Sequence, residues 1–164
     1  MSADEVNYCP LCGSSLQKGH RAGRIRPVCP RCGWIFFPDP KVAVLTLITQ
    51  QRKVLLVQRL HAPYQGKWTL PAGYMDAGED PARAAEREVM EETNLDVQAS
   101  QLLDVIGVKR PQRGANIIIL YRGEILSGDL QAGDDAAQAA FFDLEDLPPL
   151  AFKETRAILE EYLQ

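Results

Sequence analysis

The stretch from Gly73 to Leu95 constrains the fold more than any other part of the chain, because it joins a glycine-led loop to an acidic helix. Asp80 and Pro81 mark the start of that helix. Aspartate caps helix N-termini, and proline lacks only an N–H that the first turn leaves unbonded. The residues that follow are fair helix formers, with several alanines among them. The sequence therefore predicts a helix from Pro81 to about Thr93.

Three glutamates, Glu88, Glu91 and Glu92, lie on one face of the predicted helix because their spacing is i, i+3 and i+4. Like charges at this spacing repel each other, so a solvated helix gains nothing from stacking them. A divalent cation bound between the carboxylates turns this repulsion into attraction. The spacing therefore favours a metal site, and an acidic helix that merely faces solvent is the alternative.

Further residues fall at fixed offsets around the three glutamates: Gly73, Glu79, Arg87 and Leu95. Arg87 can pair with Glu91 on the helix or with Glu79 on the preceding loop, and either pairing would lock the loop against the helix. This pattern resembles the signature of the Nudix hydrolases, which cleave nucleoside diphosphates linked to another moiety. One position departs from the family. Asn94 stands where a glycine is usual, and asparagine tolerates the left-handed conformation of a helix end nearly as well.

The resemblance implies a site for Mg²⁺ or Mn²⁺. Glu88 and Glu92 would be its primary ligands, with Glu91 completing it, since these hard cations prefer carboxylate oxygens. In similar enzymes the backbone carbonyl just before the motif, here that of Ala72, often serves as a further ligand. Three residues would organise the motif without binding the metal: Gly73, Glu79 and Arg87.

The water that attacks a pyrophosphate needs a general base, and the sequence leaves the identity of this base open. In similar hydrolases an acidic residue on a loop after the helix takes the role, and Asp135 occupies the corresponding place. Gln138 is neutral where a second acid can occur, so a glutamate of the motif is the alternative base. Asp134 and Asp135 can equally be ordinary turn residues.

All four cysteines of the chain occur as two CxxC pairs, Cys9 with Cys12 and Cys29 with Cys32, separated by sixteen residues. This spacing predicts a structural Zn²⁺ site of four thiolates, within a ribbon over residues 1–38. A glycine follows each pair and suits a tight turn whose N–H groups point at sulfur. Disulfides are the alternative, but no secretory signal precedes the cysteines.

Residues 39–164 combine β-type runs with two helical patterns and are expected to form the catalytic domain. Strands are expected over residues 41–49, 53–59, 68–71, 116–126 and 139–142, with one or two more within 95–108. An amphipathic helix is expected over residues 152–163. Strands before and after the central helix predict an α/β domain with a mixed sheet between helices, and the resemblance implies the Nudix α/β/α sandwich.

Charge and hydropathy exclude several classes of protein. The formal net charge is −4, and the longest apolar runs are far too short to span a bilayer, so no membrane partner is expected. The N-terminus is polar and acidic and does not resemble a signal peptide, which favours a cytoplasmic location. Residues 1–38 alone are mildly basic, with five Lys/Arg against two Asp/Glu, a weak indication of nucleic-acid binding.

The nucleotide substrate is less constrained than the reaction. The chain lacks the Ser-Gln-Pro-Trp-Pro-Phe-Pro-type segment of NADH pyrophosphatases with a zinc ribbon, whereas Pro111 resembles a marker of ADP-ribose pyrophosphatases. The runs around both motifs also resemble ADP-ribose/FAD pyrophosphatases that carry the same ribbon, which implies release of AMP from ADP-ribose or FAD. Four residues are candidates for substrate binding: Arg110 and Arg113 for phosphate, and Trp68 and Tyr74 for stacking on a ring. Trp68 is as easily a core residue.

Three other functions are compatible with the motifs. The first is an NADH pyrophosphatase, and the second is a protein that grips RNA with the ribbon and removes a 5′ cap. The acidic net charge argues against RNA. The third is a non-catalytic nucleotide sensor, which the retention of all three helix carboxylates disfavours. The sequence does not fix the oligomeric state, although many similar enzymes are homodimers.

Overall fold

The structure, a computed structural model, describes residues 6–108 and 114–163. It separates into two compact units, Met1–Pro40 and Lys41–Gln164. The first unit carries the cysteines and one antiparallel hairpin, formed by β1 (Gln17–Arg21) and β2 (Arg24–Val28). Within the described residues, no helix is both long and apolar enough to cross a membrane.

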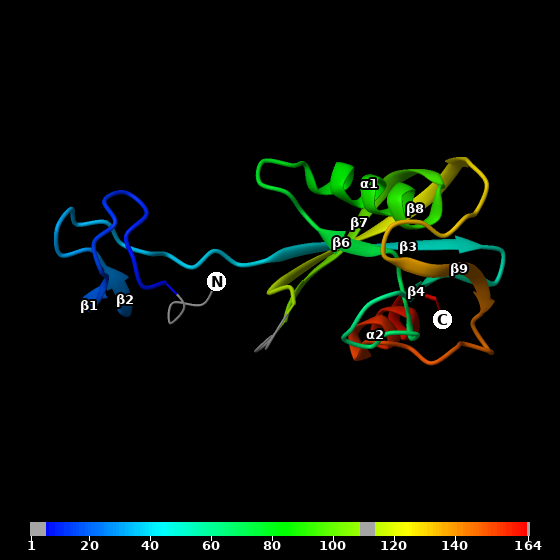
Figure 1. The fold of residues 1–164 in the computed structure, drawn as a ribbon. Coiled ribbons are helices and arrows are strands. Elements are labelled where there is room, and N and C mark those ends of the chain that lie inside the picture. The colour runs from blue at the N-terminus through cyan, green and yellow to red at the C-terminus, as the bar shows by residue number, and fades with distance from the viewer. Residues whose placement is uncertain (1–5, 109–113, 164) are drawn as a thin grey trace. The chain divides into compact units, whose positions relative to one another are not determined.

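The second unit is built on one mixed sheet with a helix on each face (Figure 1). Its elements in chain order are β3 (Val42–Gln50), β4 (Lys53–Arg59), β5 (Trp68–Thr69), β6 (Ala72–Tyr74), α1 (Pro81–Thr93), β7 (Asp96–Gly107), β8 (Ile117–Ser127), β9 (Ala136–Asp143) and α2 (Lys153–Tyr162). The strand order is β5-β4-β3-β8-β7, with β6 also paired to β3 and β9 to β4. Only the β3–β8 pairing is parallel among those described, so the predicted α/β/α sandwich with a mixed sheet is confirmed.

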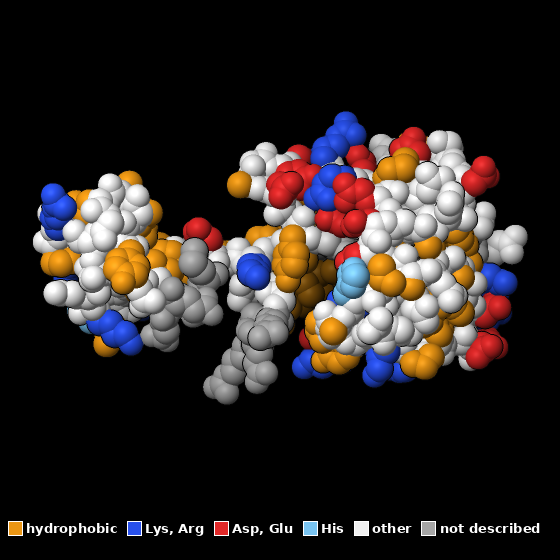
Figure 2. All heavy atoms as spheres, in the orientation of Figure 1, with side chains coloured by type: hydrophobic (Ala, Val, Ile, Leu, Met, Phe, Trp, Pro, Cys, Tyr) orange, Lys and Arg blue, Asp and Glu red, His pale blue; other side chains and the backbone are white. Residues whose placement is uncertain are grey.

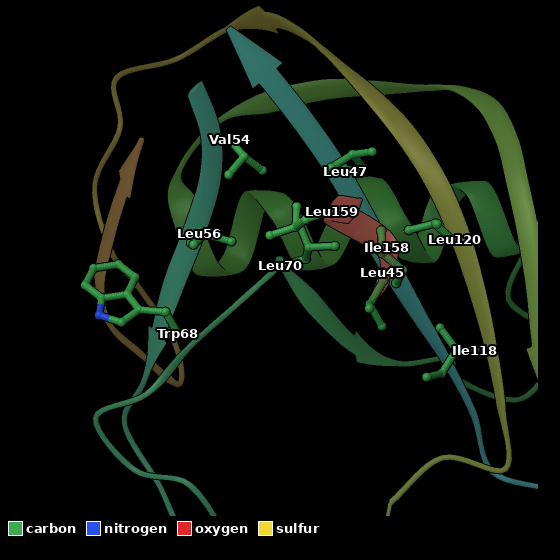
Figure 3. Close-up of a cluster of buried hydrophobic side chains, with 10 residues drawn as sticks. All are labelled: Leu45, Leu47, Val54, Leu56, Trp68, Leu70, Ile118, Leu120, Ile158 and Leu159. Carbon is green, nitrogen blue, oxygen red and sulfur yellow. The ribbon is translucent and has the colours of Figure 1, made fainter. Parts of the chain in front are cut away.

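Apolar side chains fill both sides of this sheet because the central strands are buried on both faces. The larger cluster lies under α2, which contributes Ile158 and Leu159 (Figure 3). On the other face α1 contributes Val89 to one cluster, and Ala84 and Ala85 to another. Helix α1 is therefore held to the sheet by its apolar side, which leaves its acidic side free to form a site.

Several elements differ from the sequence-based expectation in extent. The expected strand over residues 68–71 is shortened to β5, which pairs with β4, and an unexpected short strand, β6, follows it and pairs with β3. Strand β9 starts at Ala136, three residues earlier than expected, and residues 96–107 form a single strand with several register shifts. The early start of β9 matters for the site, because it brings Asp135 directly against the end of β4.

Candidate active site

Helix α1 begins and ends where its capping residues place it. The side chain of Asp80 accepts hydrogen bonds from the backbone N–H groups of Ala82 and Arg83, at 3.0 and 3.2 Å. At the other end Asn94 takes a left-handed conformation, with φ 58°, and its N–H donates to the carbonyl of Met90 at 2.9 Å. The predicted helix bounds and the expected left-handed turn at Asn94 are both confirmed.

The guanidinium of Arg87 organises the acidic side of this helix. Its Nε and Nη2 donate to the two carboxylate oxygens of Glu79, at 2.8 and 3.0 Å. Nη1 donates to Glu88 at 2.8 Å and to Glu91 at 3.0 Å, and Nη2 also donates to the carbonyl of Tyr74 at 3.1 Å. A guanidinium has five N–H donors, and all five are used here. Arg87 thus ties the loop before the helix to two of the three predicted carboxylates.

Glu79 is fixed in its ionised form. The two hydrogen bonds from Arg87, with another from the N–H of Asp76 at 3.0 Å, lower the pKa of Glu79 to about 2. The same contacts raise the pKa of Arg87 above its usual range. The pair therefore stays charged at any ordinary pH and serves as a rigid support rather than as an acid or base.

Glu88 is packed against the backbone of Gly73. A Cβ atom at position 73 would overlap the carboxyl group of Glu88, so only glycine allows this approach. Glu88 is 9% exposed. Burial raises the pKa of the Glu88 carboxyl against the opposing effect of Arg87, and the nearby charges of Glu91 and Asp135 raise it further. Position 73 of the motif therefore requires glycine, because any larger residue would overlap the carboxyl group of Glu88.

Glu92 is the most deeply placed carboxylate of the site. It is 4% exposed, and its Oε2 accepts a hydrogen bond from the N–H of Ala72 at 2.9 Å. Burial raises the pKa of Glu92 well above its usual range, although the bond from Ala72 opposes this, and the charges of Asp135 and Glu88 add to the shift. The predicted metal ligand at this position is the carbonyl of Ala72, and the structure shows that the N–H of the same residue contacts Glu92.

Asp135 reaches the same cluster from a different part of the chain. It lies on the loop between β8 and β9, and its side chain is exposed. Its carboxyl is close enough to Glu92 and Glu88 to raise the pKa of each. Glu91, whose side chain is 42% exposed, stands at the rim beside Arg87. The structure thus brings the four predicted acids together.

The donor set fits a hard divalent cation. Of the four carboxylates, two are buried, and the guanidinium of Arg87, which also binds Glu79, pairs only with Glu88 and Glu91. Carboxylate oxygens are the preferred ligands of Mg²⁺ and Mn²⁺, and an uncompensated cluster of negative charge gains most from such an ion. Figure 2 shows a gathering of acidic and basic side chains on one face of the second unit. The residues that could hold the cation are Glu88, Glu91, Glu92 and Asp135, with the backbone of Ala72 adjacent.

The predicted substrate-binding residues have different surroundings. Tyr74 is 50% exposed on β6; its carbonyl accepts from Arg87, and Nζ of Lys41 lies 5.6 Å from its ring centroid. Trp68 is 8% exposed and packs edge-on against Phe142, with ring centroids 4.6 Å apart, which favours the alternative of a core residue. Arg110 and Arg113, with Pro111 between them, lie outside the described residues.

The four cysteines converge in the first unit. Their sulfur atoms all lie within 4.8 Å of one another, with Sγ–Sγ distances of 3.5–3.7 Å for three of the pairs, and no disulfide joins them. Four thiolates around a tetrahedral zinc, at a Zn–S distance of about 2.3 Å, would lie about 3.8 Å apart. Gly13 and Gly33 adopt φ values of 70° and 78° in the expected tight turns. Cys9, Cys12, Cys29 and Cys32 therefore fit one structural zinc.

Sequence reasoning identified the loop that carries Asp135 but did not predict that this loop packs on the end of α1. Gly133 lies against the last turn of α1 so closely that a Cβ there would be 2.6 Å from the carbonyl oxygen of Glu91. The glycine in the run Gly133-Asp134-Asp135 was the available signal. It suggested a turn but not the element on which the turn packs.

Comparison with known proteins gives consistent results. The chain matches the NUDIX domain family over residues 38–162. An ADP-ribose pyrophosphatase of Methanocaldococcus jannaschii is 40% identical over 126 residues, which are 76% of this chain and 74% of that protein. The NAD-capped RNA hydrolase NudC of Stutzerimonas stutzeri is 28% identical over 160 residues. That match covers 95% of this chain, which spans about half of the relative, 55% of its length. The crystal structure of a NUDIX hydrolase from Nitrosomonas europaea has a TM-score of 0.86 and 32% identity, and the match covers 96% of this chain and 90% of that one.

Proposed function

The chain belongs to the NUDIX family of hydrolases, and from that premise we propose that it is a Mg²⁺-dependent pyrophosphatase acting on ADP-ribose or FAD and releasing AMP. One observation carries the reaction type. Glu88 and Glu92 on the helix and Asp135 on a separate loop converge. Glu88 and Glu92 are buried; Arg87 pairs with Glu88, and no basic side chain among the described residues pairs with Glu92. Such a cluster would hold a divalent cation whose charge offsets that of a phosphate.

The chemistry divides between the metal and the chain. When bound, Mg²⁺ would supply positive charge against the two phosphates and would lower the pKa of a water molecule. Glu88 and Glu92 would hold the ion, oriented by Arg87 and by the N–H of Ala72 respectively. Asp135 is exposed and adjacent, so it can accept a proton from water, with a glutamate of the motif as the alternative base. Arg87 and Glu79 would position these groups without touching substrate.

The substrate is inferred from the relatives and from the residues near the site. The relative with 40% identity is named an ADP-ribose pyrophosphatase. Tyr74, exposed on β6 with its carbonyl bonded to Arg87, would stack on the base or the flavin, with Lys41 beside it for a phosphate. Arg110 and Arg113 would add further phosphate contacts. Two properties stay predictions: a homodimer, and a cytoplasmic location, which suits four free thiols.

A second function has one specific observation in its favour. The match to NudC covers 160 residues, and Lys41–Gln164 is shorter than this, so the similarity extends into the cysteine unit. An enzyme of that kind would cleave NAD-type pyrophosphates, including an NAD cap on RNA. Against it stand the acidic net charge and the missing Ser-Gln-Pro-Trp-Pro-Phe-Pro-type segment.

Product analysis with Mg²⁺ distinguishes these functions. ADP-ribose, FAD, NADH and NAD-capped RNA are incubated with the protein, and the released nucleotides are separated by chromatography. AMP from ADP-ribose or FAD, with slower cleavage of NADH and capped RNA, is the expected result. Faster release from capped RNA would favour the second function. Cleavage of none of the four by metal-loaded protein would contradict both.

A further inference from the structure

We propose that the loop from Gly128 to Asp135 is a positioning device that caps the C-terminal turn of α1 and so holds Asp135 beside Glu92. Asn94 and Gly133 are its positioning residues. The importance of Asp135 for turnover rests on the function proposed above, whereas the docking of the loop does not. The family resemblance assigns Asn94 only the left-handed turn at the helix end and assigns Gly133 no role.

The loop provides hydrogen bonds that the helix lacks at its end. The last carbonyl groups of any α-helix have no partner within the helix. Here the N–H of Gln131 donates to the carbonyl of Thr93 at 2.9 Å, and the N–H of Gly133 donates to that of Glu92 at 3.2 Å. Glu92 thus has its side chain in the site and its carbonyl bonded to the loop. Any shift of the loop is a shift relative to Glu92 itself.

Close backbone contact makes this docking specific. A Cβ on Gly133 would lie 2.6 Å from the carbonyl oxygen of Glu91, and a Cβ on Gly128 would lie 2.5 Å from that of Asn94. Both opposing atoms belong to the backbone, which cannot rotate away as a side chain can. Larger residues at these positions would therefore push the loop off the helix.

The far end of the loop is also fixed. The carbonyl of Asp135 accepts a hydrogen bond from the N–H of Leu60 at 2.9 Å, and the N–H of Ala136 donates to the carbonyl of Gly133 at 3.0 Å. Asp135 is therefore held between the end of β4 and the helix cap. This explains how an exposed acid on a loop stays within electrostatic reach of Glu92.

Asn94 adds a contact that the usual glycine of the motif could not make. Its side-chain Nδ2 donates to the carbonyl of Asp129 at 3.0 Å, while its backbone keeps the left-handed turn. The departure from the family pattern is thus a second connection between the helix and the loop. Its loss in Asn94→Gly would leave the turn intact and loosen only the loop.

Gly133→Ala is the direct test. The backbone of Gly133 lies outside the left-handed region, so alanine is tolerated there and only the contact with Glu91 is disturbed. We expect kcat for ADP-ribose to fall by about 10–100-fold, because a misplacement of about 1 Å near a reacting group has this scale of effect. KM should change by less than about threefold. Gln131→Ala is the matched control, since Gln131 uses only its backbone in the docking; it should keep parental kinetics.

A double-mutant cycle separates positioning from general damage. If Gly133 acts through Asp135, then Gly133→Ala should cost nothing further in the Asp135→Asn background. Independent losses that multiply would overturn the proposal. Thermal melts of all variants identify any that fail to fold. Asn94→Gly tests the same positioning without introducing a steric clash, and it should lower kcat by about 3–10-fold.

Mn²⁺ affinity, measured by calorimetry, gives a readout that needs no substrate. Moving the charge of Asp135 away from the cluster should weaken Mn²⁺ binding by about tenfold in Gly133→Ala. In the Asp135→Asn background, adding Gly133→Ala should weaken Mn²⁺ binding no further. If the protein cleaves no nucleotide but Mn²⁺ affinity follows this pattern, the proposed function fails and the positioning role stands. Unchanged Mn²⁺ affinity together with unchanged kcat would overturn the positioning role itself.

Discussion

Glu92→Gln tests the carboxylate site most directly, because it removes one charge while keeping the size and shape of the side chain. Glu92 is 4% exposed, and its Oε2 accepts a hydrogen bond from the N–H of Ala72 at 2.9 Å. The amide oxygen of glutamine can accept the same bond. The packing of α1 against β6 should therefore survive the substitution, and any loss of function should reflect the missing charge.

The expected effect on stability has a definite sign. Burial and the charges of Asp135 and Glu88 raise the pKa of Glu92 well above its usual range, so metal-free folded protein binds a proton that the unfolded chain has already lost. Stability contributed by this group is then present below the usual carboxyl pKa and falls as the pH rises toward the raised value. Glutamine has no charge to bury. At neutral pH without metal, Glu92→Gln should be at least as stable as the parent.

With metal bound, the parent should become more stable than Glu92→Gln. Mg²⁺ at about 100 times its Kd stabilises a folded protein by about 2.7 kcal/mol. For a chain of this size that corresponds to about 5–10 °C in melting temperature. The parent should show such a shift and Glu92→Gln should show little of it. Losing several kcal/mol of charge stabilisation in the transition state should lower kcat by about 100–1,000-fold.

The assay combines thermal melts, with EDTA or Mg²⁺, and initial rates of AMP release from ADP-ribose. Glu160→Gln, an exposed substitution on α2, is the matched control for loss of a carboxylate and should behave like the parent. Near-parental turnover of Glu92→Gln, or an unchanged Mg²⁺ shift, would refute the assignment of Glu92 to the metal site. A collapse of folding without metal would refute the argument from burial.

Three further predictions concern the support of the site and the zinc ribbon. Arg87→Lys should reduce kcat/KM by about 10–100-fold without unfolding the protein, because one ammonium cannot replace five donors; wild-type kinetics would contradict this. Cys29→Ser should lose zinc, measured by metal analysis, and lower stability or expression, whereas an unchanged melt would show that zinc does not hold the ribbon. Metal-free protein should gain no thermal protection from ADP-ribose, and a clear shift in EDTA would show that the substrate binds without a cation.

Local chemistry explains which elements could be predicted. Helix α1 has the bounds that the sequence indicated because Asp80 and Asn94 cap it with contacts to their own neighbours. The strand over residues 53–59 was likewise found at its expected position, since a polar turn and a β-branched run define it locally. The spacing of Glu88 and Glu92 placed both on one side of the helix for the same reason. Each of these inferences needed only the periodicity of an element and the residues at its ends.

Long-range packing explains the rest. Whether Trp68 faces substrate or core depends on Phe142, which lies more than seventy residues away and meets it only through the sheet. The separate strand β6 exists because residues 72–74 pair with β3, a partner that composition does not identify. The docking of Gly133 on the last turn of α1 is of the same kind. The run Gly133-Asp134-Asp135 predicts a turn, but it does not predict which surface this turn packs against.

The arrangement of charge also suggests why the motif needs both its arginine and a metal. Arg87 donates to Glu79, Glu88 and Glu91, but Glu92 and Asp135 receive none of its hydrogen bonds. A pyrophosphate carries further negative charge, so it would be repelled by these two carboxyl groups once they are ionised. Arg87 is fully engaged and cannot turn toward a substrate. The chain therefore separates two tasks that one cation could not perform together: Arg87 holds the carboxylates in place, and a divalent ion, recruited by the charge that Arg87 leaves unmatched, allows an anionic substrate to approach them.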